Sequence, residues 1–158
     1  MSELAKIPAD LKKKWDDKAA LYEEKRAAML PILRLTQEHY GFISAESEHA
    51  IAEYMGITPI HVREVVTFYD EFHNEKQGKN HIWLCHTLSC SLMGCDKMLE
   101  YLEQKLGIKA GETTPDGKFT LEKAECLGAC EIAPMMRVNK DFYGPLTEKK
   151  IDEVLDKM

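Results

Sequence analysis

Five cysteines in two tight groups constrain this chain more than any other feature of its sequence. Cys85, Cys90 and Cys95 lie within CHTLSCSLMGC, and Cys126 and Cys130 lie within ECLGAC. The first residues are charged and lack the apolar stretch of a signal peptide, so we expect a reducing compartment. Thiols stay reduced there unless they bind metal or do redox chemistry. The cysteines therefore predict a metal or redox site.

Length and charge narrow the classes of function. The 158 residues are enough to bury a hydrophobic core without disulfides. The formal net charge of −6 argues against a nucleic-acid partner, because phosphate binding needs clustered Lys and Arg. No apolar run approaches the length that spans a bilayer, so direct membrane insertion is not expected. These features predict a soluble, cytoplasmic protein.

Residues 11–72 have the hydrophobic period of helices. Apolar residues recur there at three-and-four spacing, as in amphipathic helices packed on a core. Ser44 is a candidate N-cap and Gly56 a candidate C-terminal stop. Thr58 and Pro59 read as an N-cap and a first-turn proline. We predict about four helices.

A polar segment at 73–80 is the predicted linker, which places a helical domain at 1–77 and a second domain at 78–158. The helical domain ends in an aromatic stripe. We interpret this stripe as core packing, with a groove on a partner as the alternative. Its members are Phe68, Tyr69 and Phe72.

The second half mixes strands and helices. The expected elements are a strand at 81–85, a helix at 94–107, a strand at 116–126, a hairpin at 134–144 and a helix at 147–158. A strand, a crossover helix and a second strand form a βαβ unit, whose strands are usually parallel when they share a sheet. Parallel strands end at the same edge, so the two cysteine groups are expected to converge there.

Four thiolates from two loops predict a metal site, with more than one candidate metal. Cys85 and Cys90 are separated by four residues, and Cys126 and Cys130 by three. Structural zinc favours shorter spacings without requiring them. A disulfide conflicts with the compartment and the odd count, and a thioredoxin-like redox pair needs two intervening residues. A [2Fe–2S] cluster takes two thiolates at each iron and fits the spacing better, while zinc stays open.

Four neighbours of these cysteines carry further expectations. Cys95 continues the apolar face of the helix at 94–107 and is expected to be a small core residue. His86, in the first loop, is a less favoured candidate metal ligand than the four cysteines. Gly94 and Gly128 are expected where the backbone approaches the site closely. The crossover helix is expected to begin just after Cys90 and to direct its N-terminal N–H groups at the site.

At these residues the chain resembles the thioredoxin-like [2Fe–2S] ferredoxins, and among them the 24 kDa-type (E) subunits of NADH:quinone oxidoreductase, respiratory complex I. The motifs that carry the resemblance are CHTLSC, ECLGACEIAPMMRVN and the helical stretch HYGFISAESEHAIAEYMGITPIHVREVVTFYDEF. The resemblance implies an α+β protein, with a helical bundle followed by a thioredoxin-like α/β domain. It implies that the cluster ligands are Cys85, Cys90, Cys126 and Cys130.

The resemblance also implies a role and a partner. Such a subunit carries one [2Fe–2S] cluster, binds no NADH itself, and exchanges single electrons with FMN in an NADH-oxidising flavoprotein subunit. It contributes no catalytic acid, base or nucleophile, and it lies peripheral to the membrane within a larger complex. The corresponding subunit of an NAD-linked hydrogenase or formate dehydrogenase is the alternative. A redox-sensing helix-turn-helix DNA regulator is a distant one, because the candidate recognition helix offers only Arg63 as a strong base reader.

Overall fold

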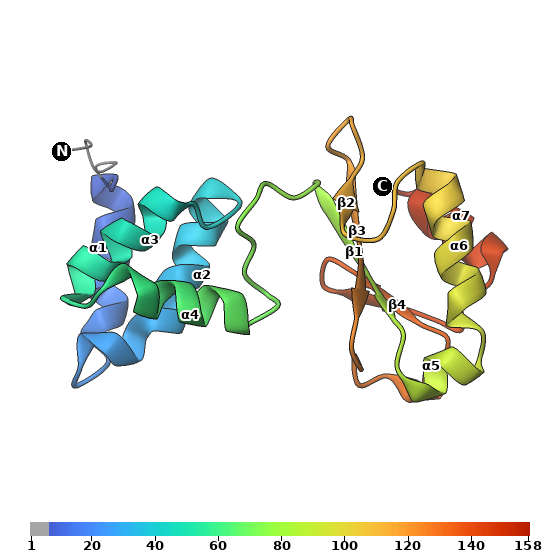
Figure 1. Ribbon diagram of the computed structural model, residues 1–158, viewed down its shortest axis with the longest axis horizontal. Coiled ribbons are helices and arrows are strands. Elements are labelled where there is room, and N and C mark those ends of the chain that lie inside the picture. Colours follow the sequence, from blue (N-terminus) through green and yellow to red (C-terminus); the bar gives the residue numbers. More distant parts are fainter. Residues whose placement is uncertain (1–6) are drawn as a thin grey trace. The chain divides into compact units, whose positions relative to one another are not determined.

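The computed structural model describes residues 7–158, which divide into two compact units (Figure 1). The first unit ends at Lys76 and the second begins at Gln77. Each unit has a hydrophobic core of its own. Among the helices of residues 7–158, none is long and apolar enough to cross a membrane.

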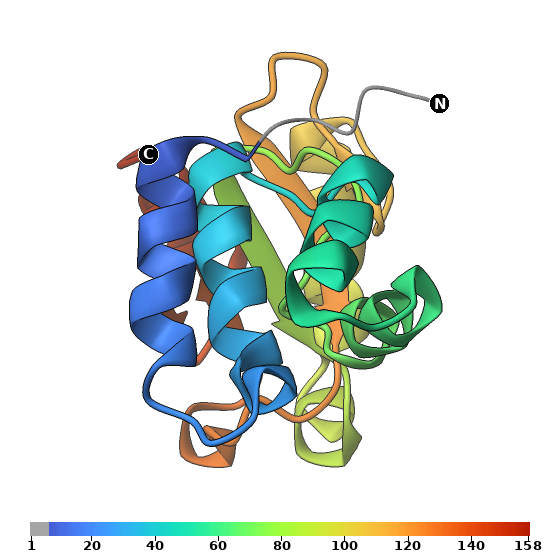
Figure 2. The ribbon, with the colours of Figure 1, turned by 90° about the vertical axis from the view of Figure 1, so that its left-hand side faces the viewer.

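The first unit is helical. Its elements are α1 (Ala9–Ala19), the 3-10 helix η1 (Lys25–Ala28), α2 (Met29–Tyr40), α3 (Ala45–Met55) and α4 (Pro59–Phe68). Helices α1 and α2 lie side by side (Figure 2). The apolar stripes meet in one core, whose fully buried members include Trp15, Ile32, Leu33, Ile51 and Val62. The prediction of about four helices is confirmed.

The ends of α3 and the start of α4 follow the predicted capping residues, with one exception. The Ser44 hydroxyl accepts a hydrogen bond from the Ser47 N–H at 3.2 Å. Gly56 ends α3 in the left-handed region at φ 70°. Thr58 precedes α4 in extended backbone, but its side chain makes no capping hydrogen bond to any described residue. Pro59, in the first turn, is therefore the main residue that favours a helix start at α4.

The aromatic stripe after α4 divides between core and surface. Phe72 is buried, as the core interpretation predicts. That interpretation is wrong for Phe68, which is 76% exposed, and Tyr69 is 40% exposed. Val62 and Val66 define the buried face of α4. Two residues correspond to about 200° around a helix, so Phe68 lies on the side opposite Val66.

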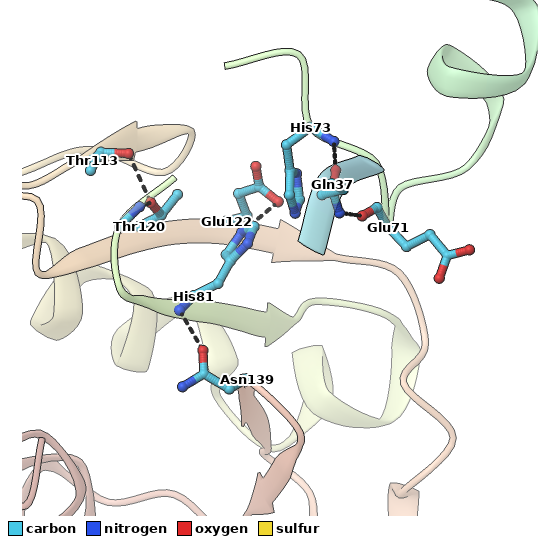
Figure 3. A network of polar contacts seen from close by, with 9 residues as sticks. Gln37, Glu71, His73, His81, Thr113, Thr120, Glu122 and Asn139 are labelled. Atoms are coloured by element: carbon cyan, nitrogen blue, oxygen red, sulfur yellow. Dashed lines mark hydrogen bonds and ion pairs between the residues drawn. The ribbon is translucent and has the colours of Figure 1, made fainter. Parts of the chain in front are cut away.

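One glutamine fastens the segment after α4 to α2 (Figure 3). The Gln37 side-chain amide donates to the Glu71 carbonyl oxygen at 2.7 Å. Its amide oxygen accepts from the His73 N–H at 2.8 Å. The Glu71 carbonyl and the His73 N–H lie beyond the end of α4 and have no partner within a helix. Gln37 forms a hydrogen bond with each of them, as a neighbouring strand would.

The second unit is a five-stranded mixed sheet with helices. Its elements are β1 (Asn80–Cys85), α5 (Leu88–Leu92), α6 (Cys95–Leu106), β2 (Glu112–Thr113), β3 (Phe119–Ala124), the 3-10 helix η2 (Cys130–Ile132), β4 (Met136–Val138), β5 (Asp141–Tyr143) and α7 (Glu148–Leu155). The strand order is β2-β3-β1-β4-β5. Strands β1 and β3 are parallel, as predicted, and every other neighbouring pair is antiparallel.

Helices α6 and α7 cover one face of this sheet (Figure 1). Between them and the sheet lies a core that includes Ile82, Leu84, Leu102, Leu121 and Ile151. On β1 the side chains alternate in direction, so His81 and Trp83 lie on the other face, where their rings stack with centroids 3.6 Å apart.

Short polar contacts fix the outer strands (Figure 3). The His81 N–H donates to the Asn139 side-chain oxygen at 3.0 Å, which fastens the β4–β5 turn to β1. The hydroxyls of Thr113 and Thr120 lie 2.8 Å apart between β2 and β3. Strand β2 was not expected from the sequence, because two residues carry no recognisable period.

Candidate metal centre

The first cysteine pair is built into the fold. Cys85 is the last residue of β1, and Cys90 lies within the short helix α5. Both are buried, with 2% and 1% of their surface exposed. Thr87 occupies the N-cap position of α5, and its hydroxyl lies 3.4 Å from Cys85 Sγ. A turn between strand and helix thus brings the two thiols together.

The two buried thiols differ in their pKa values because they make different hydrogen bonds. Burial raises the pKa of Cys85, but hydrogen bonds from the Thr87 hydroxyl and from the Thr87 and Leu127 N–H groups outweigh it, so the net pKa is lowered. Burial, followed by the hydrogen bond to Cys85, raises the pKa of Cys90 to about 11. The Met135 N–H also points at Cys90. Cys85 is therefore the better preformed thiolate of the pair.

The second pair lies on an exposed loop. Cys126 follows β3 and Cys130 begins η2, and both are exposed. Their Sγ atoms lie 3.9 Å apart. Two thiolates on one tetrahedral ion, with metal–sulfur distances of about 2.3 Å, lie about 3.8 Å apart. The spacing of Cys126 and Cys130 therefore suits two ligands of one ion.

Parallel pairing brings the two pairs to one edge of the sheet. Cys85 is directly opposite Ala124 in the β1–β3 register, so both chains leave the sheet at the same level. Leu127 and Ala129, from the second loop, pack against the buried cluster of Cys85 and Cys90. The Leu127 N–H also bonds Cys85. Sequence positions more than thirty residues apart thus meet here, as the βαβ interpretation predicts.

The cysteines are arranged as two pairs. Among residues 7–158, no three His, Cys, Asp or Glu side chains form a group that could hold a metal ion. A [2Fe–2S] cluster takes one thiolate pair at each iron. N–H groups directed at sulfur are a further feature of protein sites for such clusters. The donor set, its pairing and its N–H contacts fit a [2Fe–2S] cluster.

Cys95 and His86 lie near the pairs without joining them. Cys95 is 1% exposed at the start of α6 and packs with Cys85 and Cys90, so the prediction of a buried core thiol is confirmed. His86 is half-exposed, and its Nε2 lies 3.5 Å from a Glu125 carboxylate oxygen.

One expectation about the first loop is wrong. Helix α6 begins at Cys95, not just after Cys90, because α5 intervenes and Gly94 interrupts the helix at φ 90°. At Gly94 and Gly128 an added Cβ would meet no described atom within 4 Å, and the close approach of their backbone to a bound cofactor stays a prediction. What requires glycine is the positive φ, which is 79° at Gly128.

Sequence reasoning also missed Thr87, which contacts Cys85 through both its hydroxyl and its N–H. One signal was available. Thr is a common N-cap residue, and here it directly precedes a helix that is separated from the strand before it by only two residues. The strand was predicted, but the five-residue helix α5 was too short to show a period.

Comparison with known proteins finds relatives that match most of this chain. The E 2 subunit of the NADH-quinone oxidoreductase of Rhizobium meliloti (strain 1021) is 43% identical over 87% of this chain and 82% of its own. The E-type subunit of the Aquifex aeolicus (strain VF5) enzyme is 41% identical over 96% and 94%. Among solved structures, a chain of an NAD+-reducing [NiFe]-hydrogenase superposes with a TM-score of 0.72 at 18% identity. That match covers 82% of this chain and 22% of the hydrogenase chain, and it shows the fold alone.

A family of proteins described as thioredoxin-like [2Fe–2S] ferredoxins matches residues 15–158. The match confirms the resemblance read from the cysteine motifs, the α+β fold class and the expected [2Fe–2S] cofactor. This chain belongs to the thioredoxin-like [2Fe–2S] ferredoxin family.

Proposed function

We propose that this chain is the electron-transfer subunit of an NADH:quinone oxidoreductase, and that Cys85, Cys90, Cys126 and Cys130 hold its cluster. One observation carries the proposal. The loops that carry the two cysteine pairs leave the sheet at one edge, in a chain that is 43% identical to an E-type subunit of that enzyme. When bound, the cluster exchanges single electrons, and we propose FMN in an NADH-oxidising flavoprotein subunit as the exchange partner.

The chain's own residues bind and shield the cofactor. Thiol ligands must be deprotonated, and the lowered pKa of Cys85 favours its thiolate. Burial of Cys85 and Cys90 excludes water from one side of the site, while the exposed Cys126 and Cys130 leave the other side accessible. No side chain is needed as an acid, base or nucleophile, because electron exchange breaks no bond in the protein.

The two domains have separate roles in this proposal. Residues 78–158 hold the cluster, and residues 1–77 supply docking surface for the larger complex. The complex is peripheral to the membrane on its cytoplasmic side, and this subunit binds no NADH. The DNA-regulator alternative is disfavoured by Arg63, whose Nε lies 3.0 Å from the Glu48 carboxylate and is engaged within the unit.

The test is to purify the chain anaerobically and to measure iron, acid-labile sulfide and EPR spectra before and after reduction. We expect two irons and two sulfides per chain, with an EPR signal that appears only on reduction. Zinc without sulfide would refute the cluster. Co-purified subunits with NADH-dependent quinone reduction support the assignment, whereas hydrogen- or formate-dependent NAD reduction would move the chain to a hydrogenase or formate dehydrogenase.

A further inference from the structure

The short helix α5 buries its cysteine and exposes its large apolar side chains. Cys90 is 1% exposed, whereas Leu88 is 75%, Leu92 79% and Met93 62% exposed. Leu88 and Leu92 are four residues apart and share one side of α5, and Met93 follows at its end. Clustered exposed apolar side chains mark interaction surfaces more often than single ones do. We name Leu88, Leu92 and Met93 the α5 patch.

The α5 patch borders the candidate metal centre. Cys90, on the opposite side of α5, packs in one buried cluster with Leu127 and Ala129. These two residues belong to the loop that exposes Cys126 and Cys130. Helix α5 and the loop after β3 lie at the same end of the sheet in both ribbon views (Figures 1 and 2). A protein that covered the patch would therefore lie beside the exposed cysteine pair.

The charged residues that directly adjoin the exposed cysteines are acidic. Glu125 and Glu131 are exposed and directly adjoin Cys126 and Cys130 in the chain. A cluster with four thiolate ligands adds net negative charge when it is bound. Opposite charges at the rim of an interface favour association and set its orientation. The complementary surface is thus an apolar recess with Lys or Arg side chains at its rim.

We propose that the α5 patch docks the FMN-bearing flavoprotein subunit through an apolar recess with a basic rim. This inference rests on the proposed function, because an electron partner has to approach the accessible side of the cluster. The patch contributes the desolvated centre of the contact, and Glu125 and Glu131 lie at its rim. Apolar anchors at the centre of an interface carry most of its binding energy.

The experiment compares cluster-loaded wild type with Leu88→Gln/Leu92→Gln for binding to the purified flavoprotein subunit. Phe142→Gln is the control, because Phe142 is a 48% exposed apolar residue of the same unit and lies on the edge strand β5, outside the α5 patch. We expect the double variant to raise the Kd at least about tenfold, and the control to leave it within about twofold. Iron, sulfide and EPR spectra of the free double variant should match wild type. Wild-type binding should also weaken as salt rises.

Each other outcome overturns the inference. An unchanged Kd in the double variant, or an equal loss in Phe142→Gln, removes the α5 patch as the docking site, and salt-independent binding removes the basic rim. If the double variant loses its cluster, the single variant Met93→Gln is measured instead, and an unchanged Kd for that variant removes the α5 patch. A wild-type homodimer that the double variant dissociates would assign the patch to a second copy. A cluster-loaded wild type that never binds the flavoprotein would refute the proposed function itself, before any substitution.

Discussion

The two cysteine pairs of the proposed site lie in opposite environments. Cys85 and Cys90 are buried at the end of β1 and in α5, and N–H groups point at both sulfurs. Cys126, on the loop after β3, and Cys130, at the start of η2, are exposed. The difference shows two ways of placing a ligand. Packing in a buried cluster positions the first pair, whereas the position of the second pair depends on the conformation of exposed backbone.

Because of this asymmetry, effects on cofactor binding can be measured separately from effects on folding stability. A substitution in the buried pair removes a ligand and also leaves a cavity in a packed cluster. A substitution in the exposed pair removes a ligand but no core contact. Losses of the cofactor should therefore be similar for the two pairs, while losses of folding stability should differ.

The largest expected effect is loss of the cluster in Cys85→Ala and in Cys126→Ala. Each removes a proposed ligand, so the affinity should fall by more than the roughly 10- to 100-fold that outer partners of a metal site contribute. Without the cofactor, Cys85→Ala should lower the free energy of unfolding by about 1 kcal/mol, and Cys126→Ala by less than about 0.5 kcal/mol. Iron and sulfide analysis and urea unfolding of the apoproteins measure both.

Cys95→Ala is the control for this comparison, because Cys95 is equally buried in the same cluster of side chains. It should keep two irons and two sulfides while losing a similar amount of stability to Cys85→Ala. A Cys95→Ala protein without iron would show that burial, and not ligation, explains the loss in Cys85→Ala. Equal apoprotein stabilities for Cys85→Ala and Cys126→Ala would contradict the contrast between the pairs.

A smaller effect is expected from Thr87→Val. The substitution removes the hydroxyl 3.4 Å from Cys85 Sγ and keeps the size of the side chain. It should raise the pKa of Cys85, because that hydroxyl is one of the groups that lower it, and it should weaken cluster retention roughly tenfold. The rate of iron loss to a chelator measures retention. Ser89→Ala, on the exposed side of α5, is the control and should match wild type.

The smallest effect is a pH dependence that belongs to the buried pair. Burial raises the pKa of Cys90 from 9.0 to about 11, so the folded apoprotein holds this proton more tightly than the unfolded chain does. Its contribution to stability is complete below pH 9.0 and is lost as the pH rises through about 11. The lowered pKa of Cys85 acts with the opposite sign.

Urea unfolding of the apoprotein across this pH range tests the dependence. Stability should fall in wild type and in Cys126→Ala, since both retain Cys90. The fall should be shallower in Cys90→Ala. Parallel curves for wild type and Cys90→Ala would show that other groups control stability at high pH.

The sequence predicts the elements of this chain where a period is long enough to be recognised. The helical stripe between Leu11 and Val66 and the apolar face of α6 were read correctly, because burial repeats along each of them. The three-residue strands β4 and β5 were predicted as a hairpin, but other elements of two to five residues were not recognised. Strand β2 and helix α5 are short, and only pairing and packing in the folded unit define them.

The sequence predicts only the part of a side chain's surroundings that its neighbours along the chain supply. Phe68 continues an aromatic run yet is exposed, because the angular step from Val66 turns it away from the core. Thr87 could have been expected as an N-cap, but its contact with Cys85 depends on how tightly the chain turns after β1.

The sequence by itself determined the two cysteine pairs and the family of the chain. It also predicted that the two pairs lie at the ends of parallel strands. Ligand identity and spacing are properties of the chain, and parallel pairing follows from the strand–helix–strand order. Only the tertiary structure decided that one pair is buried and the other exposed, and that α5 presents its leucines outward. The reason is that exposure depends on atoms from distant segments, here Leu127, Ala129 and Met135, which no local pattern at Cys85 or Cys90 specifies.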